Sequence, residues 1–574
     1  MKSSKKFIIT GIVLLISVLC ILSACKKNAN GGEVVVVTDQ NGVPVTDENG
    51  EAMTVVLETE IVELTNANGE KIYDEDGNVK TSIKYIPQNV GVPVTDENGV
   101  PVTDKNGEVL TTMITVPATT GGPIVTELPL TNPDGSPVTK PDGETVTYTL
   151  EYTTTPATPG DNNANWGASF GGTSNDTFKD VAKTSDGGFV AVVQANSTDG
   201  IMQNLADGGT PVAVLVKYGA DGKMKWQKAI NSNLGITFMS VTVDSDDNII
   251  AVGYTKSTDI GFNNFGDYDA LIYKFNSNGD AQWSKHYGGS KTDGFNDVSV
   301  SPDGSYVVAG FTFSNDNDAA QYGIKDGDAR ALILKYTADG NIQFQRAFGA
   351  AGDSFKGIAC DTDNSIYAVG VFQSSAVIQN AGRADACIMK LSSGGDTQWT
   401  SSWGGSKIDT FNGITVASDG GCVIAGMSKS NDGSAKELGN YGGYDAVVVK
   451  YNKDGGLAWN TAVRGYNDES FESIEKIGSD YVAVGYSNSG NRDFKGVGNR
   501  GGQDAIVVVI AQSGSIKSIQ SYGGSGDDVF GGVCVLNDSQ VVACGSTLSK
   551  DGDLVGSKYM SDGNYTMGMI AKFK

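Results

Sequence analysis

The sequence predicts an all-β fold: a seven-bladed β-propeller of four-stranded blades, preceded by a Thr/Pro/Gly-rich stalk. Three observations predict it. Glycine is abundant, with 76 residues in 574, and short β-prone runs alternate with tight turns. A unit of about 55 to 61 residues, with four such runs, recurs after residue 160. The last copy lacks its fourth run, and a matching run, NWGASFGG (165–172), stands ahead of the first copy.

The N-terminus has the features of an export signal. Lys2, Lys5 and Lys6 precede an apolar stretch, Phe7 to Leu22, that is short for a membrane span. Leu22-Ser23-Ala24-Cys25 resembles the lipobox of bacterial lipoproteins. The resemblance implies cleavage after residue 24 and acylation of Cys25, which would anchor the chain on the extracytoplasmic face of the cell membrane. The alternative is an ordinary signal peptide with a chance cysteine.

Residues 25–160 are expected to form the stalk. The unit VTDxNG recurs at 37–42, 45–50, 94–99 and 102–107, and Asn-Gly is a strong hairpin turn. Aromatic residues are almost absent before Trp166, so this region has few large side chains for a core. A train of small hairpins and an extended spacer both remain open.

Residues 161–574 carry the repeat, whose anchors recur in nearly every copy. A phenylalanine begins each unit, and a glycine closes the second run in six of them. A tryptophan marks the fourth run in four units. The phenylalanines are Phe178, Phe238, Phe295, Phe355, Phe411, Phe471 and Phe530; the glycines are Gly253, Gly310, Gly370, Gly426, Gly485 and Gly545; the tryptophans are Trp226, Trp283, Trp399 and Trp459.

The incomplete last copy predicts how the ring closes. NWGASFGG places Trp166 at the tryptophan position of the fourth run, so this strand is expected to complete the seventh blade. Closure by strands from both ends of the domain leaves no open sheet edge. The repeats resemble the SBBP-type β-propeller repeats of bacterial cell-surface lipoproteins, through GGS, D.F, VVAGY, DA.(V/I)(V/L)K(Y/F) and the tryptophan run. That resemblance implies the fold and says little about activity.

The longest connections join the second and third runs of each unit, and they predict a functional face. Rigid scaffolds commonly carry binding residues on such loops. The loops lie near 196–210, 256–268, 314–329, 373–384, 428–444, 487–503 and 546–564. Aromatic side chains within them are candidates for stacking on sugar rings, with packing of the loops as the alternative: Phe262, Phe265, Tyr268, Tyr322, Tyr441, Tyr444 and Phe494.

An acidic residue stands two positions before the phenylalanine in six units, and Ile236 takes its place in the second. If the first strand lines the channel, these residues form an acidic ring at its mouth. We interpret the ring as structural, with each carboxylate accepting backbone N–H groups of the GGS loop, and a calcium or basic-ligand site as the alternative. The ring comprises Asp176, Asp293, Asp353, Asp409, Glu469 and Asp528; the aspartates that open the third run, Asp269, Asp385, Asp445 and Asp504, receive the same interpretation.

Composition restricts the chemistry. A net charge of -25 argues against nucleic acid as a partner. The single histidine, His286, argues against His-based triads and multi-His metal sites. Five cysteines remain in the repeat region without a CxxC pair, and we expect buried thiols, with a Cys534–Cys544 disulfide left open. We assign no catalytic residue, metal or cofactor, and we expect a monomer.

The sequence therefore favours a non-catalytic surface binding or adhesion lipoprotein whose ligand is a glycan or an envelope or host protein. One alternative is an extracellular carbohydrate-active enzyme with two carboxylates. The other is a structural component of the envelope. The fold alone does not choose between them.

Overall fold

The computed structural model describes residues 164–574, except 204, 206–210, 262–263, 324–327, 350–351, 374–381, 383, 498, 556–562 and 574, together with the backbone of strands between 26 and 151. For Ala164, Asn165 and Trp166 it describes the backbone alone. The chain divides into two units, residues 1–157 and 158–574, and each is described by itself. Residues 1–25, which hold the predicted signal segment and Cys25, lie outside the described residues.

The first unit contains antiparallel strands that pair with their neighbours in sequence. One sheet has the order β1-β2-β3-β4, and two further pairs are β5-β6 and β7-β8. Their bounds are β1 (Lys26–Lys27), β2 (Glu33–Val36), β3 (Thr54–Glu63), β4 (Thr81–Ile86), β5 (Gln88–Pro93), β6 (Thr111–Val116), β7 (Val125–Pro129) and β8 (Thr147–Glu151).

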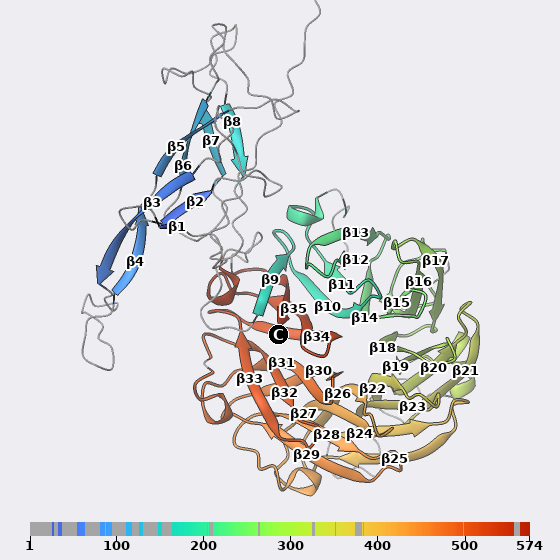
Figure 1. The fold of residues 1–574 in the computed structure, drawn as a ribbon. Coiled ribbons are helices and arrows are strands. Elements are labelled where there is room, and N and C mark those ends of the chain that lie inside the picture. Colours follow the sequence, from blue (N-terminus) through green and yellow to red (C-terminus); the bar gives the residue numbers. More distant parts are fainter. Residues whose placement is uncertain are drawn as a thin grey trace, which may run out of the picture. The chain divides into compact units, whose positions relative to one another are not determined.

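The second unit is a β-propeller of seven four-stranded antiparallel blades, as predicted (Figure 1). The strands of a blade are called a to d outward from the centre. Blade 1 is β10 (Asp176–Lys183), β11 (Phe189–Ala195), β12 (Val212–Tyr218) and β13 (Met224–Ile230); blade 2 is β14 (Ile236–Val243), β15 (Ile249–Thr255), β16 (Asp269–Phe275) and β17 (Ala281–Tyr287); blade 3 is β18 (Asp293–Val300), β19 (Tyr306–Thr312), β20 (Arg330–Tyr336) and β21 (Ile342–Phe348).

The remaining blades repeat this order. Blade 4 is β22 (Ser354–Cys360), β23 (Ile366–Phe372), β24 (Asp385–Leu391) and β25 (Thr397–Trp403); blade 5 is β26 (Asp409–Val416), β27 (Cys422–Ser428), β28 (Asp445–Tyr451) and β29 (Leu457–Val463); blade 6 is β30 (Glu469–Ile477), β31 (Asp480–Ser487), β32 (Asp504–Ile510) and β33 (Ile516–Tyr522); blade 7 is β34 (Asp528–Asn537), β35 (Gln540–Thr547), β36 (Met567–Phe573) and β9 (Ala164–Phe170).

Blade 7 is completed by the N-terminal strand of the domain. Strand β9 pairs antiparallel with β36, and Trp166 stands opposite Lys572 in the register. Phe170, at the end of β9, is buried at 1 % exposure and packs against Phe178 of blade 1. The predicted closure is therefore confirmed, and it joins the first and last blades.

Every strand a carries a β-bulge just after its phenylalanine. In blade 6, Phe471 pairs with Gly485 and the next pair is Ser473 with Val484, so Glu472 is the extra residue. A Cβ on Gly485 would lie 2.0 Å from the carbonyl oxygen of Ser470. The close approach of the bulge favours glycine at this position of strand b, which explains why six units keep it, whereas blade 1 has Val193 there.

Adjacent blades are locked by the aromatic residue of strand d. Trp226 of blade 1 lies against the c–d turn of blade 2, where a Cβ on Gly279 would come within 2.7 Å of the indole. Trp459 and Gly514 repeat this contact between blades 5 and 6, and the indole N–H of Trp459 donates to the carbonyl of Gln512 at 3.1 Å. The same contact therefore recurs at more than one interface between blades.

The helical content of the described residues is limited to short 3-10 turns in the b–c loops. Five blades carry one, and each buries the side chain at its third position: Met202, Ala319, Ala435, Phe494 and Leu554. None of the helices in the described part of the chain is long and apolar enough to cross a membrane.

Candidate functional site: central channel and long-loop face

The seven a strands surround a central channel with a cavity of about 620 Å³. After the bulge, the a strands contribute successive rings of seven equivalent residues, all of which line the cavity except Gly357 and Gly532. The bulge ring is Lys179, Met239, Asn296, Lys356, Asn412, Glu472 and Gly531; the next is Asp180, Ser240, Asp297, Gly357, Gly413, Ser473 and Gly532; the third is Ala182, Thr242, Ser299, Ala359, Thr415, Glu475 and Cys534. The charge around these rings is uneven, because only blades 1, 3 and 6 contribute acidic residues to them.

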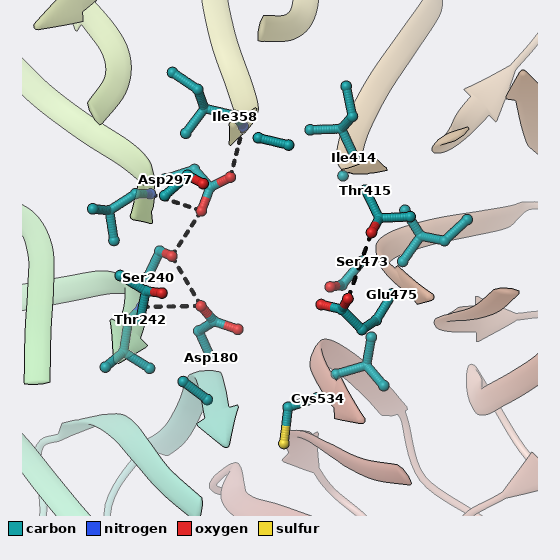
Figure 2. A pocket seen from close by; sticks show the side chains of 18 of the residues that line it. Asp180, Ser240, Thr242, Asp297, Ile358, Ile414, Thr415, Ser473, Glu475 and Cys534 are labelled. Atoms are coloured by element: carbon teal, nitrogen blue, oxygen red, sulfur yellow. Dashed lines mark hydrogen bonds between the residues drawn. The ribbon is translucent and has the colours of Figure 1, made fainter. Parts of the chain in front are cut away.

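Asp180 of blade 1 and Asp297 of blade 3 meet across Ser240 of blade 2 (Figure 2). The Ser240 hydroxyl lies 2.9 Å from Oδ2 of Asp180 and 2.8 Å from Oδ1 of Asp297. Backbone N–H groups of neighbouring a strands complete the set: Val241 donates to Asp180 at 3.0 Å, and Ile358 donates to Asp297 at 2.7 Å. The two carboxylates therefore tie blades 1 to 4 together at the channel wall.

Burial raises the pKa of both acids. The pKa of Asp180 rises to about 6, opposed by its hydrogen bonds from Val241, Val181 and Ser240. The pKa of Asp297 rises to about 7, because burial is reinforced by the nearby charge of Asp180. The sequence analysis does not predict this pair. In the sequence, the two aspartates are visible only as substitutions at a repeat position that has serine or glycine in the other five blades.

Glu475 faces the pair from the opposite wall, near Thr415 and Cys534 (Figure 2). The Thr415 hydroxyl lies 3.5 Å from Oε1 of Glu475, and burial raises the pKa of this carboxyl. Burial also raises the pKa of the Cys534 thiol, which therefore stays protonated and is a weak nucleophile. Cys534 and Cys544 are free thiols, so the disulfide left open above is not formed.

The predicted acidic ring is buried rather than open to the channel mouth. All six members are fully buried: Asp176, Asp293, Asp353, Asp409, Glu469 and Asp528. Asp409 shows the pattern, since it accepts the N–H of Gly405 at 2.9 Å and the hydroxyl of Ser430 at 2.7 Å. An acid of this kind connects the d–a loop to the start of the b–c loop through hydrogen bonds. This is the arrangement expected if the acid has a structural role.

The aspartates that open strand c lie beneath the same loops. Asp269, Asp385, Asp445 and Asp504 are all buried. Asp504 Oδ2 accepts the N–H of Arg500 at 2.9 Å, and burial raises its pKa to about 7. Burial raises the pKa of Asp445 to about 7, with a further contribution from the nearby charge of Glu469. In the part of the chain that the structure describes, no group of three or more His, Cys, Asp or Glu side chains is arranged to hold a metal ion.

The predicted loop aromatics are not equivalent. Phe494 is only 1 % exposed and is the buried side chain of its 3-10 turn, so its ring cannot stack on a ligand. Tyr322 packs on the core, with its hydroxyl 3.3 Å from that of Tyr287. Phe265 is 44 % exposed, and its ring lies 5.1 Å from that of His286. Phe262 lies outside the described residues.

The predicted tyrosines next to strand c are each covered by a cation. Lys256 Nζ lies 4.1 Å from the ring centroid of Tyr268, and Lys429 Nζ lies 4.9 Å from that of Tyr444. Tyr441 is 46 % exposed, and the guanidinium carbon of Arg492 lies 3.6 Å from its ring centroid. Among the predicted aromatics, Tyr441 thus combines a contact with a cationic side chain and an exposed ring.

Exposed large apolar side chains favour the long-loop face. Among the described residues, three lie at the start of strand d: Met224, Ile342 and Leu457. The others lie in the b–c or d–a loops: Leu234, Phe265, Ile408, Tyr441, Tyr466, Val555 and Tyr565. Because the start of strand d adjoins the short c–d turn, seven of these ten side chains lie on the long-loop face and three lie on the opposite face.

Comparison with known proteins adds little beyond these observations. No family model matches the chain. The regulatory protein FlaEY of Caulobacter vibrioides is 22 % identical over 342 residues, which is 53 % of this chain and 36 % of that protein. The chain thus spans about a third of that relative's length.

Two solved structures are similar at low identity. YCF48 bound to a D1 peptide has a TM-score of 0.37 at 10 % identity and covers 73 % of this chain and 98 % of its own. The polysaccharide lyase Uly1 has a TM-score of 0.38 at 10 % identity and covers 72 % of this chain and 100 % of its own.

Proposed function

We propose that this chain is a non-catalytic binding module that presents the long-loop face of its propeller outside the cytoplasm, where the face recognises a glycan or a protein. The observation that carries the proposal is the distribution of exposed large apolar and aromatic side chains: among the described residues, seven of the ten lie in the b–c and d–a loops, and three lie at the start of strand d. Exposed tyrosines such as Tyr441 and Tyr466 suit ligands with both apolar and polar surface. The proposed lipid at Cys25 would hold the module at the membrane.

The buried acids of this face support binding over catalysis. Asp176 and Asp409 accept hydrogen bonds from the loops that they fasten, so the fold engages both oxygens of each carboxylate. These bonds restrain the described ends of the loops, which lowers the entropy lost there when a ligand binds. Near-identical use of these acids from blade to blade is typical of a scaffold and does not single out a reaction centre.

A second candidate function is carbohydrate cleavage in the channel, and one observation favours it. Asp180 and Asp297 are two carboxyl groups with pKa values raised to about 6 and about 7, at the wall of one cavity. Glycoside hydrolases use such a pair. Against it, both acids already accept hydrogen bonds from backbone N–H groups and lie within hydrogen-bond distance of the Ser240 hydroxyl, which orients them along the wall.

Thermal unfolding with a ligand panel tests the proposal. The chain from residue 26 onward, which lacks the predicted signal segment and Cys25, is melted with polysaccharides of several classes and with envelope extracts, each in calcium or in EDTA. A ligand at 100 times its Kd adds about 2.7 kcal/mol to the free energy of unfolding and raises Tm. A rise without release of new reducing ends supports a binding module. Release of reducing ends would establish the enzyme instead, and no rise with any ligand would favour a structural component.

A further inference from the structure

The junction of blades 5 and 6 breaks the repeat at four positions on the long-loop face. The residue after strand d is glycine in five blades and Arg464 here; the equivalents are Gly171, Gly288, Gly349, Gly404 and Gly523. Two residues later, the small residues Thr173, Asn233, Ser290, Ser406 and Ser525 correspond to Tyr466. The backbone N–H of each donates to a b–c loop side chain: Asp199, Asp259, Asp316, Asp432 and Asp551 in the other blades, and Asn491 here.

The fourth departure is Arg492, which has a left-handed backbone conformation with φ 57°. Its equivalents are Gly200, Gly433 and Gly552, with φ between 57° and 66°, and Asn317 with φ 50°. Glycine and asparagine tolerate this conformation, and a long side chain does not. A backbone outlier that a repeat elsewhere avoids is a pointer to function.

The local packing shows a further cost of Arg492. A Cβ on Gly433 would lie 2.3 Å from the carbonyl oxygen of Gly404, so the repeat leaves no space for a side chain there. The bond from the next N–H to that carbonyl is 2.7 Å in blade 5, 3.0 to 3.2 Å in blades 1, 3 and 7, and 3.3 Å from Asp493 to Arg464 in blade 6. Blade 6 thus keeps this turn although an arginine stands where the repeat has glycine.

The four departures converge on one cluster. The guanidinium carbon of Arg492 lies 3.6 Å from the ring centroid of Tyr441 and 4.9 Å from that of Tyr466. The two rings are 46 % and 54 % exposed. Arg464 approaches Tyr441 at 5.6 Å, and it is held by Asp493 at 3.3 Å and by the carbonyl of Leu438 at 2.7 Å.

Arg492 differs from Arg464 because no carboxylate among the described residues pairs with its charge. Within the described residues, its guanidinium makes neither an ion pair nor a hydrogen bond, and its carbonyl alone accepts one, from Lys495. The neighbouring aspartate of five other blades is Asn491 here, which removes a negative charge. In a chain of net charge -25, this is a fixed cation with its five N–H donors available.

We propose that Tyr441, Tyr466 and Arg492 form a subsite for an anionic sugar unit, a sugar ring that carries a carboxylate or a sulfate. The inference rests on the proposed binding function and names its ligand class. A guanidinium held in one plane binds these groups through two parallel hydrogen bonds. The exposed tyrosine surface beside it contacts the C–H face of the sugar ring, and stacking fixes the direction of the N–H donors.

Three polymers and three variants test the subsite. Polygalacturonate carries carboxylates, dextran sulfate carries sulfates, and dextran carries neither; each is titrated calorimetrically into the chain from residue 26 onward at low salt. The native chain is expected to bind at least one polyanion, more weakly as salt rises, and to bind dextran at least tenfold more weakly. The two polyanions identify which anionic group the subsite prefers.

Arg492→Gly restores the residue that three other blades use. It is expected to weaken polyanion binding by about tenfold or more while Tm stays unchanged or rises, because glycine relieves the backbone conformation. Tyr466→Ser restores the residue of blades 3, 5 and 7 and is expected to weaken binding severalfold. Asn317→Gly, the matched control in blade 3, makes the same backbone change and leaves binding unchanged.

The outcomes separate the subsite from the wider proposal. Equal polyanion affinity in the native chain and in Arg492→Gly overturns the subsite, as does equal affinity of the native chain for dextran and dextran sulfate. If the native chain binds neither polyanion but another member of the ligand panel raises Tm, the subsite fails and the binding function stands. If no ligand raises Tm, both fail.

Discussion

Asp180 and Asp297, which come from blades 1 and 3, approach the same hydroxyl group, that of Ser240, at 2.9 and 2.8 Å. A hydroxyl donates one hydrogen bond. A full set of bonds therefore needs a second proton, which one of the two carboxyl groups supplies when it is protonated. The stability of the channel wall should therefore depend on pH.

The free energy of unfolding should rise as pH falls from 7.5 to about 5. The folded-state pKa is raised to about 6 for Asp180 and to about 7 for Asp297, Asp445, Glu469 and Asp504, from ordinary values of 3.8 for aspartate and 4.5 for glutamate. Between these values the folded chain binds more protons than the unfolded chain, so stability falls as pH rises. Tm measured across this range checks the sign.

Below about pH 4 the slope should reverse. The pKa of Asp186 and of Asp303 is lowered to about 2, in each case against the effect of burial, by hydrogen bonds that include one from a lysine, Lys217 or Lys335. These groups favour the folded state only while they are ionised, so their contribution is lost as pH falls. Asp297→Asn should flatten the upper slope and leave the lower one. A Tm that decreases steadily from pH 7.5 to 5 would contradict the account.

Ser240→Ala should destabilise the chain by about 1–2 kcal/mol, because it leaves buried oxygens of Asp180 and Asp297 without their shared donor. Denaturant unfolding at pH 7.5 measures the change. Ser473→Ala is the matched control at the same ring position of blade 6, where the described residues offer the serine hydroxyl no hydrogen-bond partner. Equal losses for the two variants would show that the shared hydroxyl has no special role.

Gly485→Ala should destabilise blade 6 by about 2–4 kcal/mol or prevent folding, because its Cβ would meet the Ser470 carbonyl oxygen at 2.0 Å. Gly394→Ala, on a turn where a Cβ would find nothing closer than 3.8 Å, should change stability by less than about 1 kcal/mol. Denaturant midpoints of the two variants provide the comparison. A tolerated Gly485→Ala would argue against the bulge as the reason for the repeated glycine.

Phe170→Ala should cost about 3–5 kcal/mol, because this fully buried side chain connects the closing strand β9 to blade 1. Leu234→Ala, at a side chain that is 53 % exposed, should change stability by less than about 0.5 kcal/mol. Urea unfolding distinguishes them. A mild loss for Phe170→Ala would mean that the ring is stable without its closing strand.

Local regularity explains why the fold could be predicted. The recurring phenylalanine, glycine and tryptophan each have one structural role, at the bulge, opposite the bulge and against the next blade's turn. The missing fourth run of the last copy then predicts closure by β9. Each signal lies within a single unit, so spacing alone reveals it.

The candidate site was predicted less well, because it depends on departures from the repeat. Asp180 and Asp297 are single changes at a position of serine and glycine, and their proximity through Ser240 requires the ring to be closed. Arg492 aligns with Gly433 by counting five residues from the end of strand b, but its approach to the rings of Tyr441 and Tyr466 becomes apparent only in the folded chain. Phe494 lies in a loop, where the sequence predicts exposure, but its 3-10 turn buries it.

Hydrogen–deuterium exchange with and without bound polygalacturonate tests the central claim, that the long-loop face binds the ligand. We predict slower exchange in residues 431–444, 464–469 and 488–500, around Tyr441, Tyr466 and Arg492, and unchanged exchange in the a strands that carry Asp180 and Asp297. Slower exchange confined to those a strands, accompanied by shortening of the polymer, would place the function in the channel and contradict the account.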